Sequence, residues 1–148
     1  MKKLFAVIAL CFVCALALVG CNVPKDFTPK ESDFEVSLEV EKAEISAGEK
    51  LCFTIRFKNN SGYALKDVTH GGVFLRYSLT DGTRSLSPAY ADDAIVETLT
   101  KEERLLAVER DTAEIPAGKY SLTGYAEFTY HGSNYKISSP VVYEITIL

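Results

Sequence analysis

The chain has 148 residues, with 16 basic and 20 acidic side chains and a formal net charge of −4. Such an acidic composition offers no basic surface for phosphates, which argues against nucleic acid as a partner. Three of the four cysteines lie within the first 21 residues, which leaves Cys52 alone in the rest of the chain. No disulfide framework is predicted, so stability must come from burial of apolar side chains.

The N-terminus has the layout of an export signal. Lys2 and Lys3 precede a charge-free run from Leu4 to Gly20, and a basic start before an apolar stretch is typical of secretory signal peptides. The run of 17 residues is shorter than the span of about 20 that a membrane helix needs. We therefore predict a helical signal peptide over residues 1–20, with an uncleaved signal anchor or an ordinary secretory peptide as alternatives.

The signal ends in a short motif around a cysteine. Leu18-Val19-Gly20-Cys21 resembles the lipobox of bacterial lipoproteins, in which aliphatic and small residues precede a cysteine. The resemblance covers only residues 1–21. It implies that a peptidase cuts between Gly20 and Cys21 and that Cys21 carries acyl chains such as palmitate. A lipid-anchored protein would then lie outside the bacterial cytoplasmic membrane, on its outer face or on an outer membrane.

Residues 21–33 are expected to form the lipidated cysteine and a flexible tether. The stretch after Cys21 holds Pro24 and Pro29 among charged residues and has few larger apolar side chains, a composition typical of linkers. A coil of this length has a mean reach of roughly 20 Å. The folded domain is expected to span residues 34–148.

From Phe34 onward the apolar residues recur at every second position, which is the period of a half-buried β-strand. No helix longer than two turns is predicted. The segments predicted as strands are 34–40, 51–57, 73–79, about 84–87, 95–99, 104–111, 120–130 and 135–147.

Two turns connect neighbouring strands in this prediction. In the strand 73–79 we expect Val73 to face inward and Phe74 outward, and Asp81-Gly82 has the composition of a tight hairpin turn. The segments 95–99 and 104–111 are expected to pair through the polar turn at 100–103. A short helical turn beginning at Lys101 is the alternative there.

The C-terminal third contains a proline in its last strand. Pro140 has no backbone N–H, so the strand 135–147 should lie at an edge or carry a bulge. The adjoining hairpin turn is expected at residues 131–134.

Seven or eight short antiparallel strands in about 115 residues predict a two-sheet sandwich of Ig-like class; a small open barrel is the alternative. The segment PAGKYSLTGYAEF resembles the corner and penultimate strand of bacterial Ig-like modules, which implies that Tyr120 closes the corner. The chain has no tryptophan and no cysteine pair, which excludes antibody-type domains.

Ig-like topology also predicts which connections share an end of the sandwich. Residues 59–72 and 131–134 should lie at the end where the N-terminal anchor enters. The tips at the opposite end should be residues 46–50, 80–84 and 112–118.

Enzyme signatures such as Gly-x-Ser-x-Gly, a phosphate loop or His-Glu-x-x-His are missing from the sequence, so we predict no enzyme and no cofactor. Cys52 lies one position off the inward set of a strand and is interpreted as an inert thiol. His70 and His131 with Glu102 or Glu103 are an alternative metal site. The favoured interpretation is that both are solvated loop histidines, and no metal is predicted.

Tyrosine in an exposed loop is a common contact residue. Tyr63 and Tyr90 lie in long connections, and Tyr125 is expected on the outward face of a strand. These three tyrosines are the candidate ligand-binding residues. The alternative is that each packs on a neighbouring strand.

The sequence therefore predicts a lipid-anchored, non-catalytic, Ig-like binding or scaffolding domain of the bacterial cell envelope. Its expected partners are the lipid bilayer, through acylated Cys21, and a protein or other envelope component. Two alternatives stay open. A Gly-x-Tyr corner and the turn Asn59-Asn60-Ser61-Gly62 resemble BsuPI-type proteinase inhibitors, which implies protease inhibition. The domain could instead be an accessory subunit of an envelope transport or assembly complex.

Overall fold

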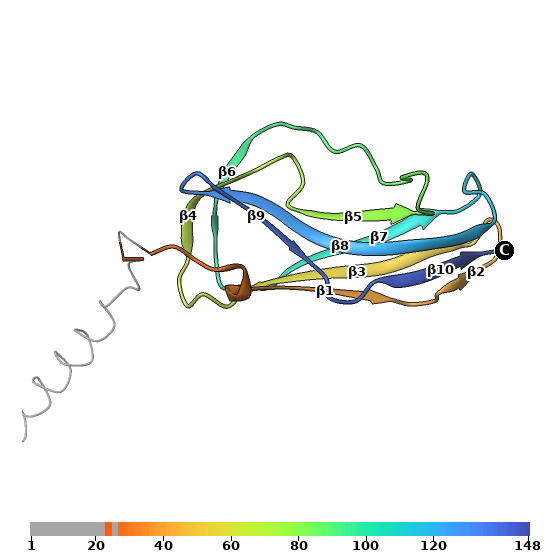
Figure 1. Ribbon diagram of the computed structural model, residues 1–148, viewed down its shortest axis with the longest axis horizontal. Coiled ribbons are helices and arrows are strands. Elements are labelled where there is room, and N and C mark those ends of the chain that lie inside the picture. The colour runs from red at the N-terminus through yellow and green to blue at the C-terminus, as the bar shows by residue number, and fades with distance from the viewer. Residues whose placement is uncertain (1–22, 25–26) are drawn as a thin grey trace, which may run out of the picture.

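The computed structural model describes residues 23–24 and 27–148 (Figure 1). The predicted signal peptide and the predicted cleavage and lipidation residues, Gly20 and Cys21, lie outside the described residues. The described chain forms two layers of β-strands. Its elements are η1 Glu31–Asp33, β1 Phe34–Val40, β2 Glu44–Ile45, β3 Lys50–Asn59, β4 Leu65–His70, β5 Leu75–Thr80, β6 Ile95–Leu99, β7 Arg104–Asp111, β8 Gly118–Tyr130, β9 Ser133–Ser138 and β10 Tyr143–Ile147.

The two layers are sheet A, with the order β1-β3-β7, and sheet B, which is built around β8. One edge of β8 pairs with β9 and β10, and β2 lies beyond β10. The other edge pairs with β5 and, at Thr129, with β4, beyond which lies β6. In the strand letters of an Ig sandwich, β1, β3 and β7 correspond to A, B and E. The strands β2, β10, β8 and β5 correspond to A′, G, F and C. The predicted fold class, a two-sheet Ig-like sandwich, is confirmed, with ten strands in place of seven or eight.

One of the additional strands is β4, which lies inside the connection that we predicted as a loop. Its register with β6 shifts between Leu65 and Val68, and Asp67 between them has a φ of 58°. Such a bulge breaks the alternation of apolar and polar residues. The period-two pattern is therefore absent from the sequence of β4.

The prediction for Val73 and Phe74 was wrong. β5 begins at Leu75, Val73 is 37% exposed, and Phe74 is 7% exposed. The Phe74 ring packs between the rings of Phe57 and Phe128, with centroid distances of 4.9 and 5.6 Å. The aromatic core draws this residue inward before the regular strand begins.

The predicted pairing of β6 with β7 was also wrong. Both strands exist, but β6 pairs with β4 in sheet B and β7 pairs with β3 in sheet A, so residues 100–103 cross between the layers. The return strand predicted at 84–87 is reduced to a single bridge between Thr80 and Ser85. Gly82 has a positive φ of 87° but Asp81 does not, so this turn is not of the two-residue primed type.

The two-residue hairpin is instead His131-Gly132, with φ values of 47° and 80° between β8 and β9. The predicted last strand divides into β9 and β10 around Pro140, and Val141, which follows the proline, is 51% exposed. Both pieces pair with the same edge of β8. The break at Pro140 agrees with the expectation that a residue without an N–H interrupts the ladder.

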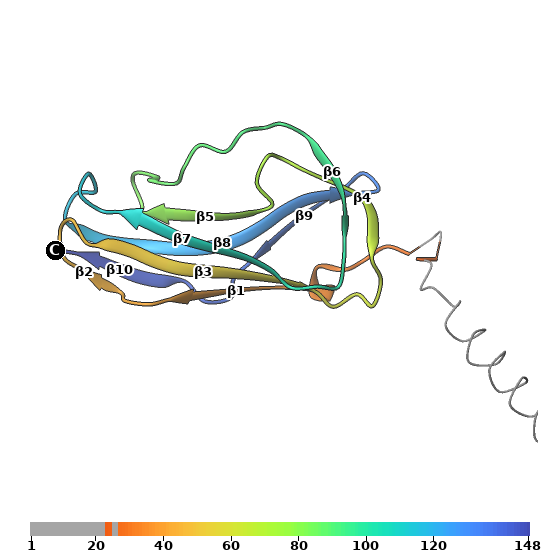
Figure 2. The same ribbon diagram turned by 180° about the vertical axis from the view of Figure 1, so that it is seen from behind.

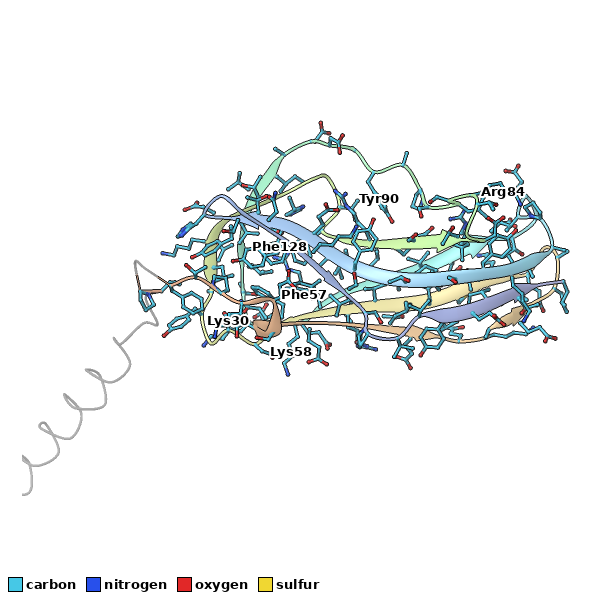
Figure 3. All side chains as sticks on the ribbon, in the orientation of Figure 1. Lys30, Phe57, Lys58, Arg84, Tyr90 and Phe128 are labelled. Carbon is cyan, nitrogen blue, oxygen red and sulfur yellow. The ribbon has the colours of Figure 1, made fainter. Side chains whose placement is uncertain are left out.

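Aromatic side chains from both sheets form the core at the end where the chain enters. Figure 3 shows Phe57 of β3 and Phe128 of β8 between the two layers, and their centroids lie 6.2 Å apart. At the opposite end the Tyr120 hydroxyl donates to the Pro116 carbonyl at 2.7 Å. The expected tyrosine corner is confirmed.

The two ends of the sandwich carry the predicted connections. β4 and the β8–β9 turn lie at the end where the chain enters, and the tips 46–50, 80–84 and 112–118 lie at the other, with the C-terminus (Figures 1 and 2). Residues 27–33, part of the expected tether, pack on the domain. Phe27 contacts the Tyr63 ring at 4.6 Å, and the Tyr135 hydroxyl donates to the Pro29 carbonyl at 3.0 Å.

Candidate functional site

A groove of about 480 Å³ crosses the outer face of sheet B near the end where the chain enters. Its floor is formed by β8 and β9. Its walls are η1 on one side and β4, β5 and the linking segment, residues 81–94 between β5 and β6, on the other. Its size lies in the range of ligand pockets, about 300–1,000 Å³. The polar side chains that line it are Glu31, Thr69, His70, Arg76, Asp92, Glu127, Thr129, Asn134 and Lys136.

The linking segment is fixed against the free edge of β5 by hydrogen bonds. The Tyr77 amide donates to the Tyr90 hydroxyl at 3.0 Å, and Figure 3 shows Tyr90 pointing from the linking segment towards β5. The Leu79 amide donates to Ser87 Oγ at 3.3 Å, and the Leu86 amide donates to the Leu79 carbonyl at 2.8 Å. These contacts cover an edge that would otherwise expose unpaired backbone groups. They also make the wall of the groove part of the fold.

Two glycines at the end of β4 allow the linking segment to approach closely. The Gly72 amide donates to the Ala91 carbonyl at 3.0 Å. A Cβ on Gly71 would lie 3.2 Å from that carbonyl oxygen and would collide with the guanidinium of Arg76. The absence of a side chain at Gly71 therefore lets both the wall and Arg76 reach their positions.

Arg76 is held on the wall of the groove by three contacts. Its Nε donates to the Val73 carbonyl at 3.0 Å, and Nη1 lies 3.4 Å from the Glu127 carboxylate. Its Cζ lies 5.1 Å from the centre of the Tyr90 ring, within the range of a cation–π contact. The side chain is only 13% exposed, so its orientation is set before any ligand arrives.

Tyr125 lies beside the groove, between two cations. The register of sheet B places Tyr125 opposite Arg76 on β5 and Ser138 on β9. Lys136 extends its Nζ to 4.8 Å from the Tyr125 ring centre. Burial raises the pKa of the Tyr125 hydroxyl, so it stays protonated near neutral pH and can both donate and accept.

The structure brings two of the three candidate tyrosines to this face. Tyr90 and Tyr125 both contact residues that line the groove, although neither lines it. Burial raises the pKa of Tyr90, whose hydroxyl is bound to the backbone of β5. Tyr63 lies at the entry end, packed against Phe27, and its carbonyl accepts from the Asn59 side chain at 2.8 Å.

His70 lines the groove and is the buried member of a partly exposed network with Glu97 and Arg104. Its Nδ1 lies 2.6 Å from the Gly71 carbonyl, which can only accept, and its Nε2 lies 2.8 Å from Glu97 Oε1. Arg104 donates to both oxygens of Glu97, and these hydrogen bonds hold the pKa of Glu97 below its ordinary value. The network joins β4, β6 and β7, and so ties the two sheets together.

The alternative metal site is not assembled among the described residues. His70 is buried with Glu97 rather than solvated, and His131 stacks on the Tyr130 ring at 4.0 Å. Within residues 23–24 and 27–148, no group of three or more His, Cys, Asp or Glu side chains is placed to hold a metal ion. Cys52 is a half-buried free cysteine on β3. No helix in this part of the chain is long and apolar enough to cross a membrane.

Sequence reasoning missed most of the residues that line the groove. Alternation within each strand accounts for the outward positions of Glu127, beside Tyr125 on β8, and of Arg76 on β5. It does not show that β9 brings Lys136 and Asn134 to the same face, because that depends on the register of the hairpin. Asp92 reaches the groove only through the course of the linking segment.

No protein-family model matches the chain, and no curated protein matches it. Among solved structures, the CARDB domain of a Pyrococcus furiosus protein, in complex with di-metal ions, is 12% identical over 81% of this chain and 97% of that chain, with a TM-score of 0.48. The sporulation control protein Spo0M of Bacillus subtilis is 14% identical over 78% of this chain and 49% of its own, with a TM-score of 0.44. A β-glucosidase from Listeria innocua, in complex with isofagomine, is 19% identical over 77% of this chain but only 16% of its own, with a TM-score of 0.44.

Proposed function

We propose that this protein is a lipid-anchored binding domain of the bacterial cell envelope that works without catalysis and holds its ligand on the outer face of sheet B. The observation that carries the proposal is the preformed groove. Its wall is fixed by backbone hydrogen bonds, and Arg76 is oriented by Glu127 and Tyr90. A site organised before binding loses little conformational entropy when a ligand arrives.

The anchor sets the distance between the groove and the membrane. The lipobox motif supports acylation at Cys21, and Phe27 is docked on the domain. The chain from Cys21 to Phe27 extends to about 20 Å at most. The groove lies near this end of the domain, so its ligand belongs to the layer of the envelope closest to the lipid.

Lipid attachment is tested in cells grown with a clickable fatty acid. The wild-type chain should be labelled and should fractionate with membranes, because Cys21 supplies the acylated thiol. Cys21→Ser should lose the label and leave unprocessed precursor, whereas Cys52→Ser should be labelled as wild type. Equal labelling of the Cys21→Ser chain would contradict the anchor.

Binding is tested by sedimentation of the purified full chain, in detergent, with envelope fragments from which the membrane lipid has been extracted, so that the acyl anchor does not itself bring the chain down. We expect the double variant Tyr125→Ala/Lys136→Ala to sediment much less than wild type. Thr54→Ala, on the outer face of sheet A, should sediment as wild type. Equal sedimentation of all three proteins would show that the groove is not the binding site.

A further inference from the structure

We propose that the groove takes a neutral, hydroxyl-rich ligand, a short segment of an envelope saccharide, an inference that rests on the binding function proposed above. The structural basis is a groove that offers both donors and acceptors, mixes charges of both signs, and is bordered by the half-exposed ring of Tyr125.

The groove holds charged side chains of both signs, with one more carboxylate than cations. Arg76 and Lys136 are its cations, and Glu31, Asp92 and Glu127 are its carboxylates. Arg76 is already paired with Glu127, and Lys136 lies over the Tyr125 ring. An excess of one negative charge among interspersed cations and carboxylates gives only a weak field for steering a polyanion or a polycation. A ligand without net charge avoids the cost of taking a charge out of water on binding.

The hydrogen-bonding groups of the groove suit hydroxyls. Each sugar hydroxyl donates and accepts, and it therefore needs partners of both kinds. The Thr129 hydroxyl donates to Asn134 Oδ1 at 2.7 Å, which leaves the Asn134 NH₂ group as a donor. Glu127 and Asp92 offer acceptors, and Thr69 offers a hydroxyl. The planar carboxylate and amide groups present two polar atoms side by side, the arrangement that adjacent hydroxyls on a sugar ring can engage together.

Tyr125 supplies the apolar part of the site. A sugar ring has one or two faces made of C–H groups, which pack against an aromatic ring. Tyr125 is half-buried on the outer face of sheet B, and Arg76 and Lys136 fix its surroundings. Among the exposed and half-buried residues that line the groove, only Gly71 and Ala94 are not polar, so the groove does not fit an acyl chain or an apolar peptide segment.

The test is a titration of each probe into the full chain in detergent micelles, with NMR chemical shifts as the measurement. The probes are cellotetraose, maltotetraose and chitotetraose, with tetra-alanine as a zwitterionic rival and tripolyphosphate as an anionic one. We expect at least one neutral tetrasaccharide to shift the groove signals saturably, and neither rival to do so.

Matched variants locate the binding. Tyr125→Ala should lower the affinity for the tightest-binding tetrasaccharide by about tenfold, a change in binding free energy of about 1.4 kcal/mol. Glu127→Gln, which keeps the shape of the side chain, should weaken it several-fold. Glu39→Gln on sheet A and Tyr63→Ala at the entry end should leave it unchanged. Thermal melts would verify that each variant is folded.

Saccharide binding is overturned if no tetrasaccharide shifts the groove signals at millimolar concentration, if a rival binds there instead, or if Glu127→Gln and Glu39→Gln behave alike. In each of these cases, groove-dependent sedimentation with envelope fragments would leave the binding function standing and remove only the ligand class. If the groove variant Tyr125→Ala/Lys136→Ala sedimented with envelope fragments as well as wild type, the proposed binding function itself would be contradicted.

Discussion

The outer faces of the two sheets carry similar residue types but differ in shape. On sheet A, Arg56 lies 3.6 Å from Glu39 and 3.5 Å from Glu103, and Lys50 lies 2.7 Å from Glu109. The depression beside Arg56 measures only about 150 Å³. Exposed ion pairs of this kind are worth little and are screened by salt.

Sheet B also carries ion pairs, such as Lys119 with Glu144 at 2.8 Å. What sets it apart is the linking segment, which stands over one side of the sheet and turns a flat polar surface into a groove of about 480 Å³. The comparison indicates that charged residues alone do not make a binding site on a sandwich. The wall that the linking segment forms along one side of sheet B makes the difference.

The largest loss of stability is expected from a substitution in the aromatic core, because that core packs against both sheets. Phe57 packs edge-on against Phe74 and Phe128 and is fully buried. Phe57→Ala should lower the free energy of unfolding by about 3–5 kcal/mol, because it removes apolar contacts and leaves a cavity. Urea denaturation would measure it. A loss below about 1 kcal/mol would mean that the aromatic core does not join the sheets.

The contribution of the His70–Glu97–Arg104 network to stability should depend on pH. Hydrogen bonds from Arg104 lower the pKa of Glu97 in the folded state, so Glu97 contributes stability above its unfolded pKa and loses it as the pH falls through the folded value. Glu97→Gln should cost about 1–2 kcal/mol near pH 7. The difference between wild type and variant should shrink towards pH 2 in denaturation curves. A difference that stays constant with pH would contradict the role of the carboxylate.

A substitution at Gly71 tests whether the close approach of the linking segment holds the wall of the groove in place. Gly71→Ala should cost about 1 kcal/mol or less, since the Arg76 guanidinium can move away from the new methyl group. The groove should nevertheless change, with faster amide exchange in residues 86–94 and altered shifts at Arg76. The signals of β1 and β3 should remain as in wild type. Unchanged exchange in residues 86–94 would show that the close approach does not hold the wall.

The smallest effect is expected on sheet A. Arg56 is 39% exposed and forms only long contacts with its two glutamates. Arg56→Ala should change the free energy of unfolding by about 0–1 kcal/mol, and envelope sedimentation should stay at the wild-type level. A strong loss of sedimentation would move the binding face to sheet A.

The sequence predicts the sandwich where side chains alternate, as in β1, β3 and β8, since a half-buried strand imposes that period directly. It fails at β4, where the bulge at Asp67 breaks the alternation, and at Phe74, which the aromatic core draws inward. Both depend on contacts between distant segments.

The sequence predicts only those residues of the candidate site whose position follows from the alternation of a single strand. Tyr125 was placed on the outward face because its own strand alternates. Lys136 and Asp92 were missed because the hairpin register and the path of the linking segment bring them to the groove. No local pattern in the sequence records either of these arrangements.

Hydrogen–deuterium exchange of the full chain, with and without isolated envelope fragments, tests most directly whether sheet B is the binding face. We predict slower exchange in residues 69–76, 86–94 and 125–136, which form the groove, and unchanged exchange in residues 50–59 and 104–111 of sheet A. Protection of the sheet A segments, with the groove unchanged, would contradict the account.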